Sequence, residues 1–210
     1  MSSRLSFPLA YLITAGECDQ SNFDEESARI LSNIEAAVNE GTDLVQIREK
    51  RLSGKLLMEL AERAVKITQG SRTKLLINDR SDIALAVGAD GVHLTSTSLP
   101  ARAVRDKAPR GFCIGVSVHT VDEARDAVAS EADFALFGPI FPSPEKGSGV
   151  GTEALRELCT SVAGFPVVAV GGVDEANVSS VLEAGAAGFA GIRAFDDPDS
   201  VRRIMTRTAS

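Results

Sequence analysis

Residues 74–94 read KLLINDRSDIALAVGADGVHL, in which two short, mostly apolar runs flank a longer amphipathic one. KLLIN (74–78) and GVHL (91–94) are typical of strands, whereas residues 80–88 predict a helix that Gly88 ends. Because the strand candidates are almost continuously hydrophobic, they suit parallel strands that are covered on both faces. This stretch therefore predicts a strand–helix–strand unit of a parallel α/β protein.

The same alternation continues along the whole chain. The runs predicted as strands are 10–14, 43–47, 74–78, 91–94, 112–116, 133–137, 166–170 and 188–192. The runs predicted as helices are 25–39, 53–69, 80–88, 99–107, 121–130, 151–163, 175–184 and 198–207. Ser53, Thr120 and Asp174 stand where they can cap helices.

Eight strand-then-helix units in a chain of this length predict a (β/α)8 TIM barrel that forms one domain over residues 1–210. The alternative is an open, doubly wound sheet. That fold usually has a glycine-rich turn after its first strand, and residues 14–20, TAGECDQ, lack one. The motifs GADG (88–91) and GAAG (185–188) both precede strands and hint at a repeated helix–strand joint.

Composition limits what the protein can bind. The net charge of −7 argues against a general nucleic-acid surface, so an anion site must be a local group of cations. The three cysteines are widely spaced, form no zinc-binding pattern and predict reduced thiols. No segment has the length of a membrane span, and the N-terminus is too weak for a signal peptide. We therefore expect a cytoplasmic protein; a homo-oligomer is compatible with the sequence.

Polar residues gather where the predicted strands end, which is where TIM barrels bind their ligands. In VQIREK (45–50), alternation places Arg48 and Lys50 on one face of the strand and Glu49 on the other. Together with Lys146, these cations suit a polyanion such as a diphosphate. The alternative is a solvated strand end in which Glu49 pairs with the cations, with Lys146 an exposed loop lysine.

A second anion site is expected after the seventh and eighth strands. Gly171, Gly172 and Gly191 can offer backbone amides to a monophosphate, helped by Arg193, although a glycine pair often marks only a turn. Asp79 can hold Mg²⁺ against a polyanion, because this cation commonly uses one or two carboxylates plus phosphate oxygens.

The two histidines have different expectations. His93 is predicted to be a structural residue near the core. His119 either caps the helix that begins near Thr120 or, because it lies at a strand end, takes part in function.

The sequence resembles thiamine phosphate synthases and their relatives, the thiazole tautomerases, over nearly its whole length. The motifs that carry the resemblance are QIREK (46–50), LLINDR (75–80), ALAVGADGVHL (84–94), IGVSVHT (114–120), FGPIFPSPEK (137–146) and AVGGV (169–173). The resemblance implies a barrel that joins a hydroxymethylpyrimidine diphosphate to a thiazole phosphate and releases diphosphate. It assigns the pyrimidine diphosphate to Gln46, Arg48, Lys50, Asn78, Asp79, Ser143 and Lys146. It also implies that Ser117 is the family's serine after strand five and that Gly171 and Gly172 bind the thiazole phosphate.

One motif departs from the synthase pattern. Synthases typically carry Gly-Gln-(Glu/Asp)-Asp after strand four, and the last acid is a second metal ligand; here the stretch is Thr95-Ser96-Thr97-Ser98. Ser98 in place of that acid weakens the expected Mg²⁺ site. The acid-free stretch looks more like the tautomerase branch, which uses a histidine at the position of His119 to move a proton. The sequence therefore leaves three hypotheses open: a synthase, a metal-independent tautomerase, and a non-catalytic binder of thiamine intermediates.

Overall fold

The computed structural model describes residues 7–142 and 147–192. In this part of the chain, eight parallel strands close into a barrel in chain order, and the last strand pairs with the first. The strands are β1 (Leu9–Ile13), β2 (Leu44–Ile47), β3 (Lys74–Asn78), β4 (Gly91–Leu94), β5 (Cys113–Val118), β6 (Phe134–Phe137), β7 (Val167–Val170) and β8 (Gly188–Gly191). The predicted TIM barrel is confirmed, and the doubly wound alternative is wrong.

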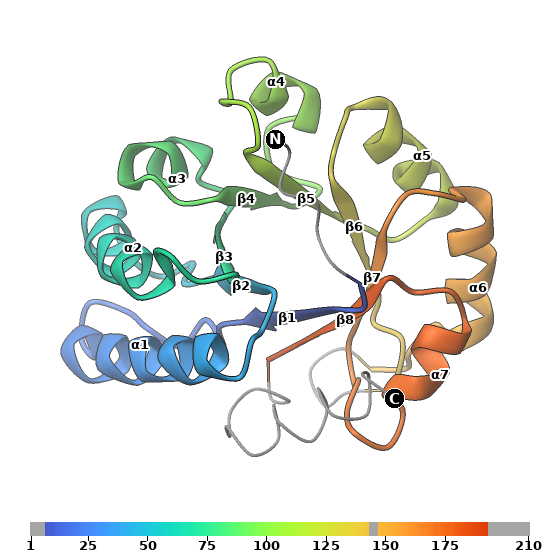
Figure 1. The fold of residues 1–210 in the computed structure, drawn as a ribbon, viewed down its shortest axis with the longest axis horizontal. Coiled ribbons are helices and arrows are strands. Elements are labelled where there is room, and N and C mark those ends of the chain that lie inside the picture. Colours follow the sequence, from blue (N-terminus) through green and yellow to red (C-terminus); the bar gives the residue numbers. More distant parts are fainter. Residues whose placement is uncertain (1–6, 143–146, 193–210) are drawn as a thin grey trace.

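The helices surround this ring of strands (Figure 1). They are α1 (Phe23–Asn39), α2 (Gly54–Thr68), α3 (Ser81–Val87), α4 (Ala101–Arg105), α5 (Val121–Ala129), α6 (Gly151–Ser161) and α7 (Val178–Glu183). The helix predicted over 198–207 lies outside the described residues. Within the described ranges, no helix combines the length and the apolar character needed to cross a membrane.

The caps predicted for α2 and α5 are confirmed, whereas the one predicted for α7 is wrong. Ser53 and Thr120 accept hydrogen bonds from backbone amides of the first helical turn. Asp174 instead accepts hydrogen bonds from the amides of Ala176 and Asn177. The chain therefore makes a separate turn after Asp174, and α7 starts later than predicted.

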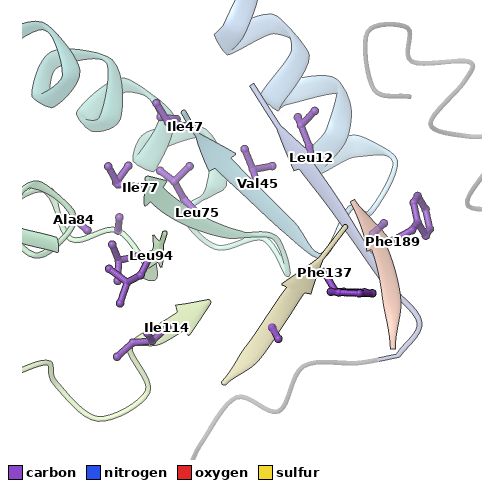
Figure 2. Close-up of a cluster of buried hydrophobic side chains, with 14 of the residues drawn as sticks. Leu12, Val45, Ile47, Leu75, Ile77, Ala84, Leu94, Ile114, Phe137 and Phe189 are labelled. Atoms are coloured by element: carbon purple, nitrogen blue, oxygen red, sulfur yellow. The ribbon is translucent and has the colours of Figure 1, made fainter. Parts of the chain in front are cut away.

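Alternate residues of the strands pack in two separate apolar layers. Outward side chains fill the space between strands and helices, as Figure 2 shows for Val45, Ile47 and Ile77. Inward side chains such as Leu44 and Phe134 fill the barrel itself. Complete burial of each large apolar side chain stabilises the fold by about 1.5–3 kcal/mol. The inner layer also forms the floor beneath the mouth, where the strands have their C-terminal ends.

An aspartate before β2, β4 and β6 ties each of these strands to its predecessor. The carboxylates of Asp43, Asp90 and Asp133 precede β2, β4 and β6, and each accepts the backbone amide of a residue in the preceding strand. The register places Ala187 at the equivalent position before β8. The motifs GADG and GAAG thus mark two copies of one joint, and the second copy has no carboxylate.

The glycine that follows in both motifs has a steric reason. A Cβ at Gly91 would lie 2.1 Å from the carbonyl oxygen of Cys113, and one at Gly188 would lie 2.3 Å from that of Leu9. A neighbouring strand therefore passes too close for any side chain at these positions.

Candidate active site

Side chains at the C-terminal ends of the strands line a cavity of about 280 Å³ in the mouth of the barrel. A neighbouring cavity of about 310 Å³ shares Lys50, Asn78 and Thr95 with it and is also lined by Asp79. The predicted site residues that line the first cavity are Gln46, Arg48, Lys50, Asn78, Ser117 and His119. The fold thus brings together residues that lie up to 73 positions apart, from Gln46 to His119.

Glu49 does not pair with the cations on either side of it. It is 3% exposed, and its two carboxylate oxygens accept the amides of Gly16 and Cys18 at 3.1 and 2.9 Å. Within the described residues, the guanidinium of Arg48 and the ammonium of Lys50 form no ion pair. Both cations line the mouth. The alternative in which Glu49 neutralises them is therefore wrong, and their positive charge is available to an anion.

A chain of hydrogen bonds crosses the floor of the cavity. The Tyr11 hydroxyl donates to Gln46 Oε1 at 3.0 Å, and Gln46 Nε2 donates to Asn78 Oδ1 at 2.9 Å. On the other side, His93 Nδ1 lies 3.3 Å from the Tyr11 hydroxyl, and His93 Nε2 lies 2.9 Å from Ser117 Oγ. We call these five residues the floor network.

His93 is a buried neutral base in this network. Its side chain is 1% exposed, and burial, assisted by the positive charge of Arg48, lowers the pKa of His93 to about 3. The expectation that His93 is structural agrees with its burial. Tyr11 was missed as a site residue, although it is the single tyrosine of the chain and faces inward between Leu9 and Ile13.

Asp79 lies at the entrance to α3 in a left-handed backbone conformation, with φ of 65°. This conformation is uncommon for residues other than glycine, and aspartate tolerates it better than most. The adjacent Arg80 directs its guanidinium to the carboxylate of Asp82. Among the described residues, no side chain pairs with the exposed carboxylate of Asp79. It is therefore available to a cation or a donor from a ligand.

Ser98 does not replace the missing acid. Its hydroxyl accepts the Thr95 amide at 2.7 Å and lies 3.1 Å from the Thr95 hydroxyl, so it closes the turn after β4. In residues 7–142 and 147–192, no group of three or more His, Cys, Asp or Glu side chains is placed to hold a metal ion. A cation beside Asp79 would have to take most of its ligands from a substrate and from water.

Gly171 and Gly172 follow β7 with φ of 94° and 65°. A Cβ at Gly171 would lie 2.6 Å from Cα of Pro139, and one at Gly172 would lie 2.8 Å from Cβ of Phe141. Both glycines are therefore required by the turn, and no described residue accepts a hydrogen bond from either amide. Gly191 ends β8 opposite Leu12.

The structure excludes one of the two roles expected for His119. The cap of α5 is Thr120, so His119 is not the capping residue. Its Nδ1 lies 3.3 Å from the carbonyl oxygen of Gly138, and its ring lines the mouth cavity. Three other predicted site residues, Ser143, Lys146 and Arg193, lie outside the described residues.

Comparison with known proteins agrees with this arrangement. The family model described as thiamine monophosphate synthase matches residues 10–195. The chain is 43% identical over 177 residues to a thiamine-phosphate synthase of Methanoculleus marisnigri, covering 81% of this chain and 83% of that one. It is 40% identical over 195 residues to a thiamine-phosphate synthase of Methanoregula boonei, covering 91% and 87% of the two chains. A solved structure of thiamine phosphate pyrophosphorylase from Pyrococcus furiosus superposes with a TM-score of 0.81 at 28% identity, covering 96% of this chain and 95% of that one.

Proposed function

The chain belongs to the thiamine monophosphate synthase family, and we propose that the mouth of its barrel is where hydroxymethylpyrimidine diphosphate and thiazole phosphate are joined. The enzyme is a transferase of thiamine biosynthesis: it releases diphosphate and forms thiamine phosphate. The observation that carries the placement is the pair of cations at the cavity, Arg48 and Lys50, which form no ion pair with the described residues. We expect the enzyme to work in the cytoplasm.

Arg48 and Lys50 are proposed to stabilise the departing diphosphate. The bond between the pyrimidine methylene carbon and the diphosphate oxygen breaks, and its electron pair leaves with the diphosphate. The thiazole nitrogen then supplies the electron pair of the new carbon–nitrogen bond. Fixed cations lower the barrier because negative charge develops on the leaving group, and holding the two rings side by side removes the entropic cost of their encounter. Lys146 and Ser143 are proposed to complete the diphosphate site.

The two rings are proposed to occupy different parts of the mouth. Gln46, Asn78 and Ser117 lie together at the floor, where their amides and hydroxyl can orient the pyrimidine. The amides of Gly171 and Gly172 have no acceptor in the described part of the chain, and they suit the phosphate of the thiazole, because backbone N–H groups after the seventh strand bind phosphate in many barrels. Gly191 and Arg193 are proposed to close this second anion site.

Mg²⁺ fits the site with a reduced set of protein ligands. Asp79 has an available carboxylate beside Lys50, whereas Ser98 is engaged in its own turn. Asp79 would hold the ion together with diphosphate oxygens, as is usual for this cation. When bound, Mg²⁺ supplies additional positive charge against the leaving group. The chain's own cations act on the same group whether or not the ion is present.

Incubation of the purified protein with both substrates, with and without Mg²⁺, tests this function. We expect diphosphate and thiamine phosphate to form, and Arg48→Ala to lower kcat by about 100-fold or more, as loss of a transition-state charge contact usually does. Arg125→Ala is the matched control, because Arg125 lies exposed on α5 and pairs only with Asp122 among the described residues. Equal activity of the two variants would contradict the placement of the site.

The same assay separates the other two hypotheses. A tautomerase would isomerise the thiazole phosphate alone, without metal, and His119→Ala would abolish that turnover. A non-catalytic binder would bind either intermediate in calorimetry and turn over neither. The relatives reported above are named synthases, and they give no support to either of these alternatives.

A further inference from the structure

The floor network joins side chains from five different strands through four consecutive contacts. Tyr11 lies at its centre and is fully buried, and His93 and Gln46 are each 1% exposed. The rings of Tyr11 and Phe134 pack edge to face, with centroids 5.6 Å apart and an interplanar angle of 84°. Water therefore has little access to the polar groups of Tyr11, His93 and Gln46, and these groups find their partners within the network.

The positions of the protons follow from the chemistry of each group. Gln46 donates through Nε2 to Asn78, so its Oε1, which can only accept, takes the single proton of the Tyr11 hydroxyl. Because the Tyr11 hydroxyl has only that one proton to donate, its oxygen must accept a hydrogen bond from His93 Nδ1. A neutral imidazole carries only one N–H, so Nε2 of His93 has a lone pair and accepts the hydroxyl proton of Ser117.

The two ends of the network then present opposite hydrogen-bonding character to the cavity. The oxygen of Ser117 has only lone pairs left, and the side-chain oxygen of Asn78 is already engaged, which leaves its NH₂ group as the donor. Both residues line the cavity. A ligand ring held between them must therefore offer an N–H group to Ser117, and an unprotonated nitrogen or an oxygen complements the NH₂ group of Asn78.

We propose that Tyr11 and His93 are positioning residues that hold Ser117 as an acceptor and Asn78 as a donor, and so select a heterocycle bearing an amino group next to ring nitrogens. The identity of that heterocycle as the pyrimidine diphosphate rests on the proposed function. Among the described side chains, Tyr11 and His93 form hydrogen bonds only within the floor network. Their effect is on which ring is accepted, and the departure of the diphosphate is left to other groups.

The tautomer of His93 can be read directly by NMR of the protein labelled with ¹⁵N histidine. The chain has two histidines, so the spectrum contains two imidazoles, and His119→Gln identifies the signal of His93. We expect the Nδ1–H form in the wild type and a shift toward Nε2–H or a mixture in Tyr11→Phe, which keeps the ring and removes the hydroxyl. An Nε2–H form in the wild type would overturn the proposal, whatever the protein's activity.

The selectivity is measured as the ratio of kcat/KM for the aminopyrimidine diphosphate over its analogue with oxygen in place of the amino group. We expect Tyr11→Phe to lower this ratio by about tenfold, mainly through a higher KM for the amino substrate, because a lost polar contact discriminates by about this factor. Phe134→Leu is the control, since it loosens packing on the same rings without removing a hydrogen bond. An equal loss of selectivity in Phe134→Leu would show that only packing matters and would overturn the proposal.

Failure of the proposed function has a separate signature. If the wild type turns over neither pyrimidine diphosphate, the proposed function is wrong. The histidine spectrum of the wild type and Tyr11→Phe then decides the positioning role alone.

Discussion

Glu49→Gln tests whether a buried carboxylate holds the loop between β1 and α1 at the mouth. Glu49 accepts two backbone amides of that loop, those of Gly16 and Cys18. Glutamine can accept only one of them, and its NH₂ group would face the other amide donor. A hydrogen bond to a charged group contributes about 1.5–3 kcal/mol, so we expect the free energy of unfolding to fall by about 2–3 kcal/mol. This is a large part of the total of about 5–15 kcal/mol that is usual for a folded domain.

Urea unfolding followed by far-UV circular dichroism measures this loss. With a slope of about 2 kcal/mol/M, the midpoint should fall by about 1 M. Glu62→Gln is the matched control, because Glu62 is exposed on α2, and it should leave the midpoint unchanged. The loop also lies against Arg48, whose Nη1 would be 3.3 Å from a Cβ on Gly16, so KM for the diphosphate substrate should rise in Glu49→Gln. Identical midpoints for the two variants would refute this account of Glu49.

Four further outcomes are expected. Ala187→Asp should raise the free energy of unfolding by about 1 kcal/mol in the same urea assay, because the new carboxylate would face the Val167 amide as the other aspartates face an amide of the preceding strand. A lower urea midpoint would contradict this expectation. Gly171→Ala should raise KM for the thiazole phosphate more than for the pyrimidine diphosphate, because its Cβ would displace Pro139, and unchanged KM values would show that this turn does not shape the site. Burial raises the pKa of the three thiols to about 11 or 12, so at pH 8 a disulfide reagent should react slowly with the native protein and fast in urea. Immediate reaction of more than one thiol would contradict the burial of Cys18 and Cys113. The thiols are those of Cys18, Cys113 and Cys159, and in the unfolded chain they ionise near pH 9. The free energy of unfolding should therefore also fall as the pH rises from about 9 to about 11.

The order of strands and helices could be predicted because each parallel strand is a short, almost continuously apolar run in the sequence. The helix ends were less predictable, since capping depends on local turns, as at Asp174. The mouth residues followed from one rule, that barrel ligands bind at the C-terminal ends of strands. From that rule alone, Arg48, Asn78 and His119 could be expected to lie near one another, and they line one cavity.

The floor network could not be predicted, because it depends on which residues of non-adjacent strands face each other across the barrel. Tyr11 and Gln46 lie on adjacent strands, but the reach from Tyr11 to His93 spans the interior and follows from barrel closure and tilt. The backbone conformation of Asp79 was equally hidden, since the sequence gives no signal of a positive φ at an aspartate. Local pattern predicts which elements form, and the packed interior decides how their polar groups pair.

The chain contains one tyrosine and no tryptophan, so its near-ultraviolet emission comes almost entirely from a single phenol. That phenol is Tyr11, sealed beneath the mouth and bonded to the Gln46 amide. Light emitted by the unlabelled enzyme therefore reports on one place, the bottom of the pocket, with no competing signal from the surface. Titrating each substrate against this emission offers a spectroscopic view of pocket occupancy that is independent of turnover.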